Sequence, residues 1–299
     1  MKYWQSGFVL MFSKEILSNA KNHILKHARP IDKALYLFEF EDDPKQDVID
    51  QLKHYQNRDG GFGHGLEPDI QMPRSSVIAT TVAFQYINEI KQFPDEIIKP
   101  AINFFLKTIQ KFPVESELNY FWYLTPMEVN SSPHAPWWNI KEQKPPENEE
   151  WPNISVEVIG YLLQFSHLVP RDLIKELTDD LNTYLHLVPE LTGFIYFKFL
   201  CFKRILNQIP KTLQKEIFKM LDNTFSTSNH LNEKSFEHIK IQWMITERSS
   251  YLYQKYPEII NNLLKQEVDR LGTDGGSHPK WKWGEDDLWG KIEKNWSGK

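Results

Sequence analysis

The chain has 299 residues, of which 40% are hydrophobic and 14% aromatic, so it can bury a substantial core. A formal net charge of −5, with basic and acidic residues interspersed, argues against nucleic-acid binding. The single cysteine, Cys201, excludes a disulfide framework and a multi-cysteine zinc site. No stretch stays apolar over the roughly 18 residues that a membrane span needs. These features predict a cytoplasmic protein without an integral membrane segment.

Apolar residues recur at helical spacing along almost the whole chain. In chain order, the pattern predicts helices within residues 16–28, 31–38, 48–55, 75–90, 98–109, 155–165, 173–181, 194–205, 213–220, 236–243, 260–271 and 289–296. Ser75 and Ser76 are expected to cap the fourth helix. No strand of useful length is predicted, and the nearest candidate is the aromatic run 120–124. A loop rich in proline and tryptophan, residues 112–153, interrupts the helices, and a loop of this length is usually functional or disordered.

Prolines mark the start of every second helix and reveal a repeat. They are Pro44, Pro94, Pro170, Pro210 and Pro257. Once the long loop is allowed for, the spacing predicts helical hairpins repeated in a single domain that spans residues 1–299. The predicted fold is all-α, either a closed α/α toroid of about six hairpins or an open α-solenoid. In both, the three loops that follow residues 48–55, 98–109 and 260–271 lie on one rim, opposite the proline turns.

Two similar motifs follow amphipathic helices: YQNRDGGFG at residues 55–63 and a weaker copy, DGGSHPKWKWG, at residues 274–284. They resemble the repeat of the squalene cyclase and protein prenyltransferase β-subunit superfamily, in a bacterial branch with a SPHAPWW-like segment, here residues 132–138. The resemblance implies an α/α toroid in which the repeat glycines and Gln56 are structural. It does not extend to activity, because the chain has neither the D-x-D-D motif of cyclases nor the Asp-x-Cys zinc motif of prenyltransferases.

Four ionisable residues are predicted to be catalytic. They are Asp59, Glu67, Asp69 and His134. The three acids share one glycine-rich loop with a histidine, and carboxylates beside a histidine suit acid/base chemistry. Glu67 precedes Pro68, which favours an extended backbone at that point. An Asx turn is the alternative role for Asp59, and hydrogen bonding within the loop is the alternative for Glu67 and Asp69.

Seven further residues on the loops of this rim are predicted to bind a ligand. They are His64, Trp137, Trp138, Asp274, Trp281, Trp283 and Glu285. Tryptophan faces bind sugar rings or cationic intermediates, although the same residues could form a hydrophobic lid over the helix ends. His64, His134 and His278 do not have the spacing of a metal motif, so neither a metal nor a cofactor is predicted.

These features predict a protein that binds a small-molecule ligand in the toroid mouth and acts as a cyclase- or lyase-like acid/base enzyme. One alternative is a carbohydrate-active enzyme of the glycosidase or polysaccharide lyase type, and another is a non-catalytic binding or scaffold protein. A dry apolar pocket would favour the first, an open groove with facing carboxylates the second, and the lack of a cavity the third.

Overall fold

A computed structural model describes residues 13–193, 195–227, 245, 248–279, 281–283 and 287–297, and these are mostly helical. The α-helices are α1 (Lys14–His27), α2 (Pro30–Glu41), α3 (Lys45–Lys53), α4 (Val77–Ile90), α5 (Asp95–Thr108), α6 (Pro152–Gln164), α7 (Arg171–Leu187), α8 (Ile195–Ile205), α9 (Lys211–Thr227), α11 (Tyr251–Lys255), α12 (Pro257–Asp269) and α13 (Asp287–Ser297). The all-α class predicted from the sequence is confirmed. None of the helices in these ranges has the length and apolar character needed to cross a membrane.

The helix starts follow the predicted local signals. Ser76 caps α4 by accepting a hydrogen bond from the backbone N–H of Ala79 at 3.2 Å. Pro44 and Pro94 directly precede α3 and α5, and Pro257 is the first residue of α12. Proline fits these positions because its fixed φ suits a helix start and its missing N–H would have no helical partner.

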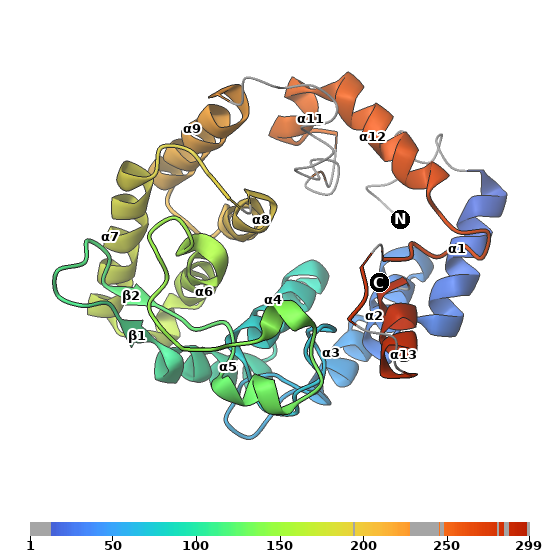
Figure 1. The fold of residues 1–299 in the computed structure, drawn as a ribbon, viewed down its shortest axis with the longest axis horizontal. Helices are drawn as coiled ribbons and strands as arrows, with labels where there is room; N and C mark the ends of the chain where they lie inside the picture. The colour runs from blue at the N-terminus through green and yellow to red at the C-terminus, as the bar shows by residue number, and fades with distance from the viewer. Residues whose placement is uncertain are drawn as a thin grey trace.

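The helices form two layers along a curved path. The inner layer is α2, α4, α6 and α8, in which each helix contacts the next. Figure 1 shows α5, α7 and α9 outside them, and α5 and α7 pack against α6. At the other end of the chain α13 contacts α1, so the first and last described helices are neighbours (Figure 1).

The long segment between α5 and α6 is ordered by its own tryptophans. Trp122 and Trp151 are fully buried, and their indole N–H groups donate to the carbonyl oxygens of Phe105 at 2.9 Å and Tyr120 at 2.7 Å. The segment contains β1 (Gln110–Lys111) paired antiparallel with β2 (Tyr120–Phe121), and the short 3₁₀ helices η2 (Met127–Ser131) and η3 (Pro136–Trp138). Two of its tryptophans are therefore core residues.

A buried ion pair links the inner helices. Glu157 of α6 is fully buried and accepts hydrogen bonds from Gln85 of α4 at 2.9 Å and Arg204 of α8 at 2.8 Å. Tyr161 donates to the same carboxylate at 2.5 Å. A buried carboxylate is tolerated only when its lone pairs are satisfied, so this network fixes how the three helices pack.

Two details differ from the sequence prediction. The two-residue strands were not expected, and neither was α11, which is too short for a periodic signal. The helix predicted within residues 236–243 lies outside the described residues.

Candidate functional site

The first Asp-Gly-Gly turn is fixed against helix α5. Asp59 Oδ1 accepts a hydrogen bond from the backbone N–H of Gly61 at 3.0 Å, which is the Asx turn considered as its alternative role. Gly60 has φ +94°, and a Cβ there would lie 2.1 Å from the carbonyl oxygen of Pro100. A Cβ on Gly61 would lie 2.7 Å from the ring of Phe104. Only glycine fits this close approach of the turn to the helix.

The second turn repeats this arrangement on helix α1. Asp274 Oδ1 accepts from the N–H of Gly276 at 3.1 Å, and Gly275 has φ +85°. A Cβ on Gly275 would lie 2.4 Å from the carbonyl oxygen of Asn19, and one on Gly276 would lie 2.6 Å from the ring of His23. The two contacted helix residues are four positions apart, as they are on α5, so the two turns dock in the same way.

Gln56 connects the first turn to the next helix, as the family resemblance implied. Its side-chain N–H₂ donates to the carbonyl oxygens of Gly60 and of Ile97, in the first turn of α5, each at 3.0 Å. The Ile97 bond spans 41 positions in the sequence and ties the segment after α3 to α5.

Asp69 lies in a tight turn that begins at Glu67. The N–H of Ile70 donates to the carbonyl oxygen of Glu67 at 3.0 Å, with Pro68 and Asp69 between them. Proline suits the second position of such a turn. The turn brings the two acids together, and Glu67 Oε1 lies 3.4 Å from the backbone nitrogen of Asp69.

Indole N–H groups from distant parts of the chain converge on the Asp69 carboxylate. Asp69 Oδ1 accepts from Trp296 Nε1 at 2.9 Å and from Trp283 Nε1 at 3.1 Å. The Trp137 indole also interacts with this carboxylate. Burial, together with the charge of Glu67, raises the pKa of Asp69 from 3.8 to about 6, although the three indole groups act against the rise.

Two exposed tryptophans complete the surroundings of Asp69. Trp137 is 53% exposed and Trp281 is 39% exposed. The ring of Trp281 meets that of Trp296 edge to face, with centroids 5.7 Å apart. We call Glu67, Asp69, Trp137, Trp281, Trp283 and Trp296 the Asp69 cluster. It presents a buried carboxyl group beside solvent-accessible aromatic surface.

The segment that carries His134 pairs with the Asp69 turn through its backbone. The N–H of Ala135 donates to the Asp69 carbonyl oxygen, and the N–H of Gln71 donates to the Pro133 carbonyl oxygen, both at 2.9 Å. The His134 ring nitrogens lie 2.6 Å from the Ser132 carbonyl oxygen and 3.1 Å from Asn139 Oδ1. His134 thus lies next to the cluster, while its imidazole bonds within its own segment.

Trp138 has a packing role in this structure. It packs against the small apolar cluster of Ile70, Met72 and Val129, beneath the Asp69 turn. This contact supports the turn, and the ligand contact predicted for Trp138 stays a prediction.

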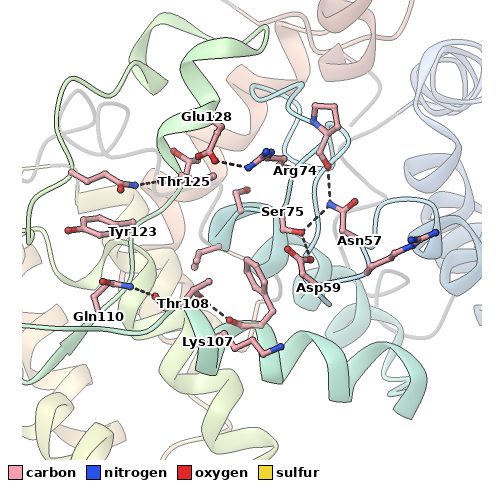
Figure 2. A pocket seen from close by; sticks show the side chains of 17 residues that line it. Asn57, Asp59, Arg74, Ser75, Lys107, Thr108, Gln110, Tyr123, Thr125 and Glu128 are labelled. Atoms are coloured by element: carbon pink, nitrogen blue, oxygen red, sulfur yellow. Dashed lines mark hydrogen bonds and ion pairs between the residues drawn. The ribbon is translucent and has the colours of Figure 1, made fainter.

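A cleft of about 850 Å³ opens on the other side of the same loop. Figure 2 shows Asp59 and Ser75 on one wall, Tyr123 and Thr125 on the opposite wall, and Glu128 at the upper end. None of its lining residues belongs to the Asp69 cluster. We call it the Asp59 cleft. Asp59 lines it, whereas Glu67 and Asp69, the acids predicted to act with Asp59, do not.

A chain of hydrogen bonds connects His64 to this cleft. Its Nε2 lies 2.9 Å from Asn57 Oδ1, Asn57 Nδ2 donates to Ser75 Oγ at 3.1 Å, and Ser75 Oγ donates to Asp59 Oδ1 at 2.7 Å. His64 has φ +55°, a conformation that non-glycine residues adopt mainly in turns. His64 and Asp59 therefore belong to one polar network.

Asp274 takes part in a third group, at the contact between α1 and the loop after α12. Its Oδ2 lies 3.1 Å from His278 Nε2 and 3.2 Å from His23 Nδ1. The hydrogen bond from the Gly276 N–H, followed by the bond from His278, lowers the pKa of Asp274. Glu285 lies outside the described residues. Among the side chains that are described, no group of histidine, cysteine or acidic residues is arranged to hold a metal ion.

The sequence did not indicate that Arg29 holds the glycine-rich loop. Arg29 Nη1 donates to the carbonyl oxygens of Gly65 at 2.8 Å and Leu66 at 2.9 Å, while its Nε donates to Asp32 at 2.7 Å. The position of Arg29 before Pro30 indicated only a helix boundary. Trp296 was predicted only as an apolar helix position, and nothing local marks it as a partner of Asp69.

Comparisons of this chain with protein-family models, curated proteins and solved structures give no match.

Proposed function

We propose that this chain is an α/α toroid that binds a small molecule at the Asp69 cluster and acts on it as an acid/base enzyme. The repeated turn supports the closed arrangement. The turn between α3 and α4 docks on α5, the helix that follows α4, and the turn between α12 and α13 docks on α1. In a ring, α1 is the helix that follows α13. An open solenoid would leave the second turn without a helix to dock on.

The observation that carries the proposed activity is the buried Asp69 carboxyl group and its donors. A proton donor or acceptor works best when its pKa lies near the working pH, and burial brings Asp69 to about 6. The indole N–H groups of Trp283 and Trp296 hold Oδ1, so the orientation of the carboxyl group is fixed. The reaction class is proton transfer to or from a ligand held beside the turn, as in lyase or cyclase chemistry.

The aromatic faces supply the binding surface for this ligand. Trp137 and Trp281 are both exposed. Trp137 interacts with the Asp69 carboxyl group, and Trp281 contacts the ring of Trp296, which donates to that group. Flat rings of this kind bind apolar faces of cyclic molecules and stabilise positive charge that develops during a reaction.

An intrinsic fluorescence titration tests the coupling between Asp69 and the tryptophans. Loss of a proton from a carboxyl group that contacts indole N–H groups changes tryptophan emission. The wild-type protein is expected to show a step with a midpoint near pH 6, because the pKa of Asp69 is about 6. The step should vanish in Asp69→Asn and persist in Asp47→Asn, an exposed acid on α3. A step that survives in Asp69→Asn contradicts the assignment.

A ligand screen tests the activity itself. Compounds that raise the melting temperature at pH 6 are incubated with the protein, and products are sought by mass spectrometry. The proposal expects product with the wild type, weaker binding in Trp137→Ala, and binding without turnover in Asp69→Asn. Equal turnover by wild type and Asp69→Asn rules out Asp69 as the acid/base group.

A further inference from the structure

The Asp59 cleft holds two carboxylates that the proposed chemistry at Asp69 does not use. Asp59 Oδ1 is fixed by the Gly61 N–H at 3.0 Å and the Ser75 hydroxyl at 2.7 Å. Glu128 Oε1 accepts a hydrogen bond from Arg74 Nη1 at 2.6 Å in an exposed ion pair. The second oxygen of each carboxylate makes no hydrogen bond or ion pair within the described residues. Both groups are therefore oriented and retain a free acceptor.

Side-chain amides at the cleft are held in the same way. Gln143 Nε2 donates to the Thr125 carbonyl oxygen at 2.9 Å, and Gln110 Nε2 donates to the Thr108 carbonyl oxygen at 3.0 Å (Figure 2). Each amide uses one of its two N–H donors in this bond, which orients the group and leaves its oxygen as an acceptor. Tyr123 adds an aromatic ring to the wall that carries Gln110 (Figure 2).

We propose that the Asp59 cleft binds a saccharide. A sugar presents many hydroxyl donors in one plane and an apolar face of C–H groups on either side of it. Oriented acceptors without partners, together with an aromatic ring, match these two features. The volume of about 850 Å³ lies within the range of small-molecule sites. Because the cleft and the Asp69 cluster share no residue, this proposal stands independently of the proposed acid/base activity.

Isothermal titration calorimetry on the full chain tests the proposal. The probes are cellohexaose, maltohexaose and xylohexaose as neutral saccharides, and a galacturonate oligomer as an acidic one. At least one is expected to bind. Asp59→Asn and Glu128→Gln should each raise its Kd about tenfold, because a hydrogen bond to a charged group contributes roughly 1.5 kcal/mol or more.

Matched variants separate the possible outcomes. Glu117→Gln makes the same chemical change at an exposed acid on the same long segment, outside the cleft lining, and should leave Kd unchanged. Glu128 does not support the Asp-Gly-Gly turn, so Glu128→Gln remains informative if Asp59→Asn fails to fold. The proposal is overturned if no probe binds at millimolar concentration, or if binding survives both cleft variants. Loss of binding in Asp69→Asn alone would assign the saccharide to the Asp69 cluster and also overturn it.

Discussion

Asp59 and Asp69 lie ten positions apart on one loop and have different surroundings. Asp59 is exposed and held by a serine hydroxyl and a backbone N–H. Asp69 is 7% exposed and held by indole N–H groups. Burial removes water from the Asp69 carboxylate and the indole hydrogen bonds compensate only in part, so the protonated form of Asp69 is favoured at a higher pH.

At the residue scale, Asp69→Asn should stabilise the protein at neutral pH. The pKa of Asp69 is raised from 3.8 to about 6 on folding, so the folded state binds the proton more tightly and loses stability as pH rises between these values. Asparagine keeps an oxygen acceptor for the indoles and has no proton to lose. The free energy of unfolding of Asp69→Asn should exceed that of the wild type by close to zero at pH 4 and by at most about 3 kcal/mol at pH 7.5.

Chemical denaturation at the two pH values measures this difference. Asp69→Ala is the contrasting variant, since it removes the acceptor of the Trp283 and Trp296 N–H groups and should cost about 1 to 3 kcal/mol at pH 4. At pH 7.5 this cost should be offset, because alanine, like asparagine, has no buried carboxylate to ionise. If Asp69→Asn is equally destabilising at pH 4 and pH 7.5, the carboxylate is required for folding and the assigned pKa shift is wrong.

At the element scale, each Asp-Gly-Gly turn is anchored to a helix by a close backbone contact. Gly60 docks on the backbone of Pro100 in α5, and Gly275 docks on that of Asn19 in α1. A backbone contact of this kind cannot relax by a change of rotamer. The structural role expected for these glycines therefore has a physical basis in the structure.

Gly60→Ala should destabilise the protein strongly. The added Cβ would lie 2.1 Å from the Pro100 carbonyl oxygen, and the φ of +94° is unfavourable for alanine. A loss of about 3 kcal/mol or more is expected from strain and a displaced turn. Gly290→Ala is the matched control, because a Cβ there meets nothing within 4 Å and α13 should gain up to about 1 kcal/mol in helix propensity. Similar melting temperatures for the two variants would contradict this prediction.

At the scale of the whole molecule, α1 meets the end of the chain through several titratable groups. His23 and His27 on α1 have ring centroids 4.8 Å apart, and His23 and His278 have centroids 5.7 Å apart. Asp274 bonds to His23 and His278. Burial, and then the neighbouring charges of His23, Lys26 and Lys294, lower the pKa of His27, while Asp274 acts in the opposite direction.

Acidification should therefore destabilise the contact between α1 and the end of the chain before it affects the inner helices. A lowered histidine pKa means that the folded state binds fewer protons than the unfolded chain, so stability is lost as pH falls below about 6.5. Hydrogen exchange, corrected for its intrinsic pH dependence, should show lower protection of α1 and α13 at pH 5.5 than at pH 7.5, with α4 unchanged. His27→Gln should reduce the difference. A loss of protection in α4 as large as that in α1 would indicate global destabilisation instead.

Much of the helical framework could be predicted from local signals. The Ser76 cap and the prolines before α3 and α5 act within a few residues of the helix start, so the sequence alone reveals them. The pairing of Asp69 with Trp283 and Trp296 spans 214 and 227 positions, and no local pattern encodes it. The loops that form the candidate site were therefore predicted, but the hydrogen-bond partners of Asp69 were not.

The sequence by itself determined most of the described helices, the prolines at helix starts and the two Asp-Gly-Gly turns, because periodicity, capping and glycine conformation are local properties. Only the tertiary structure decided which acids share an environment. It placed Asp59 with His64 at a polar cleft, Asp69 with Glu67 among the tryptophans, and Asp274 beside α1. The physical reason is that burial and hydrogen-bond partners, which set the protonation and chemistry of a carboxyl group, come from segments far apart in the chain.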